Sequence, residues 1–269
     1  ILLIVISFLY RIEKHNPSRS SMDSVDDPAT PLLSPLEQQS NVLSSPVSHV
    51  FIKAKEILGK GVSASLQDGQ IVLGYFASFL ARSDSISINL FLPIWIFKYY
   101  VSKGECVDAN PGDLIKSSCH PAYIDASILS GVTQLFSLLG APFVGYFLDK
   151  YDRKVIVLLS SCLASLGYIL TSQVSNPSSK VNIIYLGLVG LGEIGLIVSA
   201  VALITHSGIP QDARGLISGI SSFSGALGVL ITSKIGGILF DISSGWPFLF
   251  LGLLHLVFIV VTSIYLRFR

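Results

Sequence analysis

A carboxylate set among glycines is the group in this sequence best placed for proton chemistry. Glu193 lies within an apolar run, and the surrounding residues 187–195 contain four glycines. An ionised side chain near the centre of a bilayer costs at least ~2.5 kcal/mol, so a charge in such a run is a functional candidate. Removal from water favours the neutral acid, which lets a buried Glu take up and release a proton near neutral pH. The alternative is a structural Glu hydrogen-bonded to a neighbouring helix, and the sequence leaves both open.

Arg82 and Asp84 are a second pair of charges within an apolar run. Two residues apart on a helix, they point in different directions, so each needs its own partner. Arg82 shares a helix face with Ser85 and Asn89, which predicts a hydrated wall. An ion pair between Arg82 and Glu193 would join two helices, either to bind substrate or only to support the structure.

Three further polar residues in apolar runs are weaker candidates. Lys234 lies about two turns from its predicted helix end and can snorkel to the interface. His255 is expected to be a neutral, hydrogen-bonded side chain, and Gln134 to bond either substrate or backbone.

Motifs of known enzymes are missing from the sequence. Residues 190–193, Gly-Leu-Gly-Glu, resemble the Gly-x-Gly-Asp of membrane aspartyl proteases, but those enzymes need two aspartates that share a proton. The sequence has no His-Glu-x-x-His zinc motif, nucleophile elbow or phosphate-binding loop. We therefore expect no enzymatic activity, no metal site and no cofactor.

The surrounding sequence is that of a polytopic membrane protein. Of the 269 residues, 51% are hydrophobic and 13% are charged, and the mean hydropathy is +0.66. The Lys and Arg form no basic stripe with interleaved aromatics, which argues against nucleic-acid binding. A helix of about 20 apolar residues crosses ~30 Å of hydrocarbon in the lipid bilayer. Six spans are predicted, at residues 71–99, 125–148, 155–174, 181–206, 215–240 and 247–266. The third has no charged residue between 155 and 174, which predicts a helix facing lipid.

The sequence before residue 71 has a different composition. Residues 1–10 are apolar but only half a span long, and we interpret them as the truncated end of a transmembrane helix. A signal peptide fits less well, because no basic segment precedes them and no small-residue cleavage site follows. Residues 11–70 are rich in Ser, Pro, Asp and Gln, which predicts a largely disordered linker. Residues 71–269 then form a six-helix domain.

Loop charges predict the orientation of the spans, because positive charge collects on the cytoplasmic side. The side that holds the linker and the C-terminus carries Arg11, Lys14, Arg19, Lys53, Lys55, Lys60, Lys150, Arg153, Lys154, Arg214, Arg267 and Arg269. The other side carries only Lys98, Lys103, Lys116 and Lys180. We expect the linker and the C-terminus to be cytosolic.

Two cysteines, Cys106 and Cys119, fall in the non-cytosolic loop after the first span. They can pair if that loop faces an oxidising space. Free thiols are the equally weighted alternative.

A charged hairpin at residues 145–154 joins the second and third spans. Five of its positions match, in register, the Major Facilitator Superfamily signature Gly-x-Leu-x-Asp-Arg/Lys-x-Gly-Arg-Arg/Lys, which this hairpin resembles: Gly145, Asp149, Lys150, Arg153 and Lys154. Phe147 replaces the Leu and Asp152 replaces the second Gly, so we expect a less tight turn with one extra negative charge.

The resemblance implies the C-terminal six-helix half of a twelve-helix transporter, built of two inverted three-helix repeats. The signature follows the second helix of a half in that family, as it does here. The second and fifth spans also end alike, with Gly145 four residues before Asp149 and Gly237 four residues before Asp241. The linker composition and the turn at 245–248 are similar to those of fungal multidrug-like members.

The resemblance also implies a function. It implies secondary active transport of a small solute, proton-coupled and by alternating access, with the cavity between this half and a missing N-terminal half. A non-transporting membrane sensor on the same scaffold is the alternative. Asp149 would face a helix N-terminus of the other half, and Arg153 is expected to contact Asp212. The plasma membrane or the vacuolar membrane is the expected location.

Overall fold

The structure is a computed structural model that describes residues 68–106, 119–205 and 211–267, with side chains from Arg214 onward in the last stretch. All of these residues belong to one compact unit, Gly61–Arg269. The predicted helix end at 1–10 and nearly all of the predicted linker at 11–70 lie outside the described residues.

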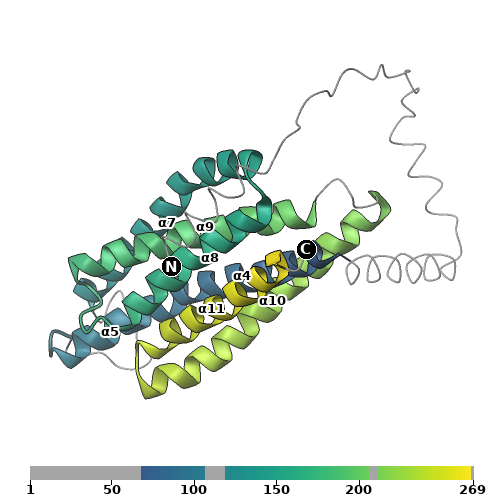
Figure 1. Cartoon of the computed structure of the whole chain (residues 1–269). Coiled ribbons are helices and arrows are strands. Elements are labelled where there is room, and N and C mark those ends of the chain that lie inside the picture. Colours follow the sequence, from purple (N-terminus) through teal and green to yellow (C-terminus); the bar gives the residue numbers. More distant parts are fainter. Residues whose placement is uncertain (1–67, 107–118, 206–210, 268–269) are drawn as a thin grey trace, which may run out of the picture. The chain divides into compact units, whose positions relative to one another are not determined.

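Helices form all the regular secondary structure of the described residues. In chain order they are α4 (Gly69–Ile86), η1 (Ser87–Phe91), α5 (Leu92–Ser102), α7 (His120–Lys150), α8 (Arg153–Ser172), α9 (Lys180–Ile204), α10 (Gln211–Ile242) and α11 (Trp246–Arg267) (Figure 1). Because α4, η1 and α5 are continuous, the unit has six helices that are long and apolar enough to cross a membrane. The predicted all-α, six-span architecture is confirmed. The largest boundary difference is at the start of α7, predicted at 125 and observed at His120.

Short acidic side chains begin two of the helices. Asp68 caps α4 by accepting a hydrogen bond from the backbone N–H of Gln70 at 2.9 Å. Asp152 caps α8 in the same way, accepting from the N–H of Lys154 at 3.0 Å. Such caps satisfy N–H groups that have no partner within the helix. The Asp in the Gly position of the hairpin signature therefore has a structural use, since it starts the next helix.

The first span contains a π-helical turn near its middle. η1 is followed by Pro93 at the beginning of α5. Proline has no N–H to donate to the carbonyl four residues earlier, which interrupts the regular α-helical ladder. π-turns often occur at functional sites. Here the turn follows directly after Asp84 and Ser85, two residues of the site described below.

Helix α9 lies at the centre of the bundle and packs against α8, α7 and α4, while α8 also packs against α11. Glycines on α9 allow the close approach to its neighbours. A methyl group on Gly192 would come within 2.6 Å of the backbone nitrogen of Ala164 on α8. Small residues at helix contacts are typical of membrane bundles, where backbone proximity replaces the hydrophobic effect.

The third span, α8, contradicts one prediction. It was expected to face lipid because it lacks charge, yet 56% of its most apolar window is buried, against 22% for α7. Its buried serines explain the difference. Ser161 bonds to His255 and Ser165 to the carbonyl of Gly252, both on α11, so the helix contributes polar contacts without carrying charge. Ser160 is also buried but bonds the carbonyl of Ile156 in its own helix.

The helix contacts are consistent with two related triplets. Helix α7 packs on α9, and α10 packs on α4, while α8 and α11 pack on each other. If the first, second and third spans correspond to the fourth, fifth and sixth, then α4 corresponds to α9, α7 to α10 and α8 to α11. Under this correspondence the α7–α9 contact becomes the α10–α4 contact, and the α8–α11 contact stays the same. This is the pattern expected of the predicted inverted three-helix repeats.

Candidate functional site: two carboxylates at the bundle centre

Glu193 lies on α9 with only 4% of its surface exposed. Its Oε1 accepts a hydrogen bond from the Ser85 hydroxyl of α4 at 2.6 Å. The same hydroxyl lies 3.2 Å from the carbonyl of Ala81, which competes for its single hydrogen. Oε2 is buried and has no hydrogen-bond partner among the described residues. The carboxyl group of Glu193 is therefore held by one hydroxyl, which it shares with the Ala81 carbonyl. Its second oxygen is available for a further contact.

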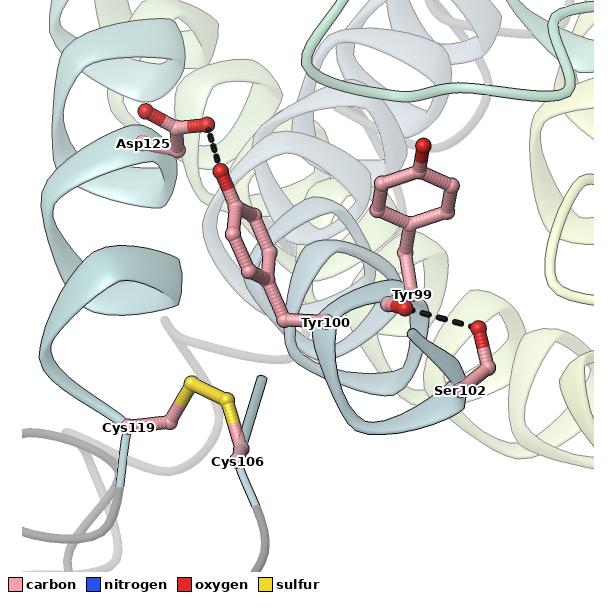
Figure 2. Close-up of a disulfide and its surroundings, with 6 residues drawn as sticks. All are labelled: Tyr99, Tyr100, Ser102, Cys106, Cys119 and Asp125. Carbon is pink, nitrogen blue, oxygen red and sulfur yellow. Dashed lines mark hydrogen bonds between the residues drawn. A yellow bond between two sulfur atoms is a disulfide. The ribbon is translucent and has the colours of Figure 1, made fainter. Parts of the chain in front are cut away.

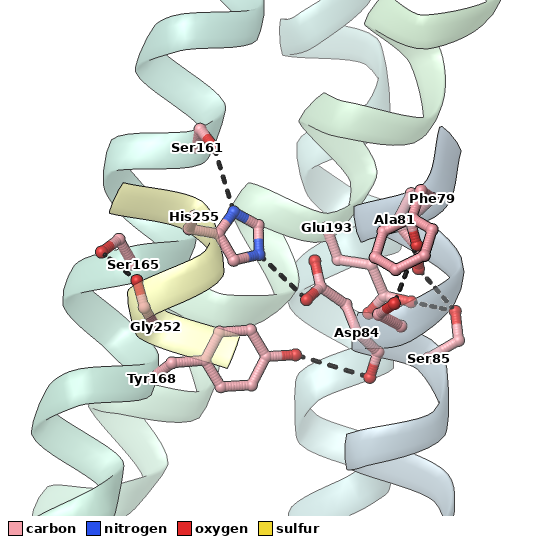
Figure 3. A network of polar contacts seen from close by, with 11 residues as sticks. Phe79, Ala81, Asp84, Ser85, Ser161, Ser165, Tyr168, Glu193, Gly252 and His255 are labelled. Atoms are coloured by element: carbon pink, nitrogen blue, oxygen red, sulfur yellow. Dashed lines mark hydrogen bonds and ion pairs between the residues drawn. The ribbon is translucent and has the colours of Figure 1, made fainter. Parts of the chain in front are cut away.

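The glycines around Glu193 explain how it reaches this position. Gly195 faces the side chain of Ser160 on α8, and Gly190 faces the backbone of Thr133 on α7, both too closely for a Cβ atom. Contacts on these two sides fix the rotation of α9 about its axis. The side chain of Glu193 is consequently directed to α4, where Ser85 meets it (Figure 3).

Asp84, the neighbour of Ser85 on α4, is fully buried and lies within a link across three helices. Its Oδ1 is 3.0 Å from Nε2 of His255 on α11. The other ring nitrogen, Nδ1, is 3.0 Å from the hydroxyl of Ser161 on α8. A carboxylate only accepts, so Nε2 carries a hydrogen, and in the neutral ring Nδ1 accepts from the hydroxyl. We call Asp84, His255 and Ser161 the buried link (Figure 3).

Tyr168 of α8 supports the buried link from one side. Its ring stacks on His255 with centroids 5.8 Å apart. Its hydroxyl donates to the backbone carbonyl of Asp84 at 3.4 Å. Both contacts fix the orientation of the imidazole ring relative to α4.

The buried link has the residue types of a hydrolase triad, but not a usable arrangement. The side chains of Asp84, His255 and Ser161 are each 0% exposed. A nucleophilic hydroxyl needs a substrate carbonyl within reach. Buried on every side, these residues instead join α4, α11 and α8.

The two carboxylates are close enough to affect each other. Asp84 and Arg82 both act electrostatically on Glu193. In a low-dielectric interior, two neighbouring carboxyl groups resist being ionised together. Each carboxyl group has one bonded oxygen and one without a partner among the described residues, but Asp84 faces an imidazole, which can carry a positive charge, whereas Glu193 faces a neutral hydroxyl.

The remaining predicted residues of the first span lie away from the buried link. Arg82 is exposed, as is Asn89, whose amide donates to the backbone carbonyl of Ser85 at 2.7 Å. Arg82 and Asp84 do point in different directions, as predicted. The Arg82–Glu193 ion pair is not found in the described part of the chain, where the bonded oxygen of Glu193 accepts from Ser85 instead. We call Arg82, Ser85 and Asn89 the polar face of α4.

Two further candidates have different outcomes. Gln134 is exposed on α7 and has no hydrogen bond to any described residue. His255, expected to be a hydrogen-bonded side chain, is bonded at both ring nitrogens and is the centre of the buried link, a connection that was not predicted. The sequence did contain a signal for this contact: Asp84 needed a partner of its own, and His255 offered a hydrogen-bond donor in another span.

At the hairpin, Arg153 reaches the end of the central helix. Its Nη1 donates to the carbonyl of Ala202 in the last turn of α9 at 3.0 Å. A cation there pairs with the negative end of the helix and with a carbonyl that lacks an intrahelical partner. The side chain of Asp212 lies outside the described residues, so the Arg153–Asp212 contact stays a prediction.

The basic residues of the hairpin also contact aromatic rings. The Nζ atom of Lys150 lies 5.8 Å from the ring centroid of Tyr151, and that of Lys154 lies 5.5 Å from the centroid of Tyr265. Cation–π contacts of this kind hold the ammonium groups against the end of the bundle. Asp149 is exposed.

At the other end of α7, two links join it to the segment that follows the first span (Figure 2). Cys106 and Cys119 form a disulfide with their Cα atoms 5.3 Å apart. The Tyr100 hydroxyl of α5 donates to Oδ2 of Asp125 on α7 at 2.6 Å. The two links hold α5 and α7 together at the end of α7 opposite the hairpin.

The six apolar helices form two related groups of three, and ionisable groups lie at the centre of the bundle. These features define a multi-pass integral membrane protein. The chain belongs to the Major Facilitator Superfamily, whose family model matches residues 74–269. The resemblance seen in the hairpin is confirmed. The likeness to fungal members stays a prediction.

Two curated relatives illustrate the range of the family. Magnetosome protein MamH of Paramagnetospirillum magneticum is 30% identical over 186 residues, which are 69% of this chain and 40% of that protein. Tetracycline resistance protein, class H, of Pasteurella multocida is 27% identical over 140 residues, 52% of this chain and 34% of that protein. The chain thus spans less than half the length of these relatives.

A solved structure shows the same fold. The inward open conformation of the xylose transporter XylE from E. coli matches with a TM-score of 0.51 at 15% sequence identity, covering 72% of this chain and 47% of that chain. At this identity the match supports the fold alone. It agrees with the observed six helices as one half of the transporter fold.

Proposed function

We propose that this chain is the C-terminal half of a secondary transporter, which moves a small solute by alternating access. The missing N-terminal half would supply the second wall of the cavity. The observation that carries the proposal is Glu193, an ionisable side chain at the bundle centre that is held by one hydroxyl beside the polar face of α4. Membership of the family and the short coverage of its relatives support it.

Alternating access requires the two ends of the bundle to behave differently. At the end with the disulfide, α5 and α7 are tied by a covalent bond and by the Tyr100–Asp125 hydrogen bond. At the hairpin end the described contacts are individual side-chain contacts, such as Arg153 with the Ala202 carbonyl. We propose the hairpin as the movable gate, with Gly145, Asp149, Lys150, Arg153, Lys154 and Asp212 as its residues. In this proposal the hairpin, the linker and the C-terminus are cytosolic, in a plasma or vacuolar membrane.

Proton coupling would use Glu193. Its buried Oε2 lacks a partner among the described residues, so the carboxyl group can exchange a proton without breaking an ion pair. Asp84 is less suitable, because loss of its charge would weaken the contact with His255. A change in the protonation of Glu193 would alter its contact with Ser85, and through it the fit between α9 and α4.

The test is solute uptake by the full-length protein reconstituted in proteoliposomes, with and without an inwardly directed proton gradient. We expect the Glu193→Gln variant to lose the dependence of uptake on pH, because the amide cannot release a proton. The matched control is Glu105→Gln, since Glu105 is an exposed carboxylate outside the described spans.

Unchanged pH-dependent uptake in Glu193→Gln would eliminate proton coupling through this residue while leaving transport itself standing. Absence of flux for every solute tried would instead favour the non-transporting sensor, which none of the relatives named above supports.

A further inference from the structure

An exposed arginine lies close to the middle of the first span. The span runs from Gly69 to Ser102, and Arg82 is far from both of its ends. At about 1.5 Å per residue, Arg82 lies ~20 Å along the helix from Gly69 and ~30 Å from Ser102, which places it in the interior of the span. A cation at this depth requires either water or an anion.

No acidic group of the described residues forms an ion pair with Arg82, although Glu193 lies within range of its charge. The bonded oxygen of Glu193 accepts from Ser85, and Asp84 is directed to His255 on the other side of α4. The Asp84–His255 contact is the only ion pair found within the described spans. Arg82 therefore presents, on the polar face of α4, a positive charge without a direct ion-pair partner among the described residues.

Helix α10 is shaped to receive this arginine. Gly225 of α10 is buried, and a methyl group there would come within 2.7 Å of Cγ of Arg82. The aliphatic part of the Arg82 side chain thus packs against α10 at a position where any residue larger than glycine would clash. This contact fixes the position of the guanidinium along α4. One turn before Gly225, the exposed Ser222 offers a hydroxyl on the same helix.

Further polar groups flank the guanidinium along α4. Ser85 follows Arg82 at a spacing of three residues, which places both on one face of α4. Asn89, in η1, is held beside them by the hydrogen bond from its amide to the carbonyl of Ser85. Asn89 is exposed. The face as a whole offers a fixed cation beside hydrogen-bonding groups, a combination that suits a ligand with an anionic end and a polar body.

From these contacts we infer that Arg82 binds the anionic group of the transported solute, a carboxylate or a phosphate. The inference rests on the proposed transport function. A guanidinium donates two parallel hydrogen bonds to either anion, which gives both affinity and orientation. Lys234, an exposed cation within α10, lies eight residues before the end of that helix at Ile242 and can reach the interface, so it needs no such ligand.

The test compares charged and uncharged solutes on the full-length protein in proteoliposomes at constant pH. The labelled probes are succinate, inorganic phosphate and glucose 6-phosphate, with glucose as the uncharged counterpart of the last. We expect at least one anion to be taken up. Arg82→Gln should raise its KM tenfold or more, whereas Arg82→Lys, which keeps the charge, should retain part of the affinity. Lys234→Gln is the matched control and should leave uptake unchanged.

The possible failures are distinguishable. Uptake of glucose alone, unaffected by Arg82→Gln, would overturn the anion site while leaving transport intact. Equal anion uptake by wild type and Arg82→Gln would overturn it as well. Arg82 would then be expected to form an ion pair with an acidic side chain elsewhere in the protein. No uptake of any probe by the wild type would overturn the proposed function together with this inference. The melting temperature of each variant in detergent separates loss of binding from loss of fold.

Discussion

Asp84 and Glu193 lie close together between the same helices, but their surroundings differ. Asp84 is sealed within the buried link, where His255 and Ser161 connect it to α11 and α8. Both carboxyl groups keep a second oxygen without a partner in the described part of the chain, but Glu193 is bonded only by the hydroxyl of Ser85 and has no such link to two further helices. Ser85, which bonds Glu193, belongs to the polar face of α4 together with the exposed Arg82 and Asn89. The difference indicates that a membrane bundle can use one carboxylate to fix its helices and keep the other adjustable.

The largest effect is expected from breaking the buried link. His255→Leu leaves Asp84 in the core without its partner, and removing one member of a buried charged pair costs about 3–5 kcal/mol. The double variant Asp84→Leu with His255→Leu should recover most of this loss, because it buries no unpaired charge. Unfolding in mixed micelles measures both. A single-variant loss under about 1 kcal/mol would mean that the link is not structural.

A smaller effect is expected from filling the helix contact behind the link. Gly192→Ala places a methyl group 2.6 Å from the Ala164 backbone nitrogen, so α8 and α9 must separate. Overpacking of this kind costs about 1–3 kcal/mol. The matched control is Gly219→Ala on α10, where no atom lies within 4 Å of the new methyl group. Thermal unfolding of both variants measures the contrast, and equal stability would show that α8 and α9 are not tightly packed.

The sequence alone predicted those features of the site that depend on a single helix. Apolar length predicted the six spans, and helical periodicity predicted that Arg82 and Asp84 diverge. The Asp84–His255 contact was not predicted, because it depends on which spans become neighbours, and His255 is 171 residues away. The burial of α8 was missed for a related reason. Its serines give no charge signal, and the hydrogen bonds of Ser161 and Ser165 depend on packing against α11.

The hairpin shows the same division between local and tertiary information. Its residues and register identified the family before any helix was placed, and the family model agrees. The contact of Arg153 with Asp212 stays a prediction. Its hydrogen bond to the carbonyl of Ala202 was not predicted. Side-chain charge can be read from a sequence, whereas an exposed backbone carbonyl depends on where the helix ends.

The smallest effect is expected at the adjustable carboxylate itself. Ser85→Ala removes the hydroxyl that bonds Glu193, a contact that already competes with the Ala81 carbonyl. A hydrogen bond of this kind contributes about 0.5–1.5 kcal/mol net, well below the loss expected for His255→Leu. The control is Ser127→Ala on α7, whose exposed hydroxyl bonds only the carbonyl of Tyr123 one turn earlier. It should change stability by less than about 0.5 kcal/mol.

The same variant tests whether Glu193 depends on Ser85 for its role in transport. In the full-length protein, uptake by Ser85→Ala should remain dependent on pH, because the carboxyl group of Glu193 is still present. Unfolding in mixed micelles and proteoliposome uptake together measure the outcome. A stability loss as large as that of His255→Leu would contradict the comparison, since Glu193 would then be as firmly built into the bundle as Asp84. Loss of the pH dependence alone would instead assign the proton to the Ser85–Glu193 pair as a unit, because neither group could then exchange it without the other.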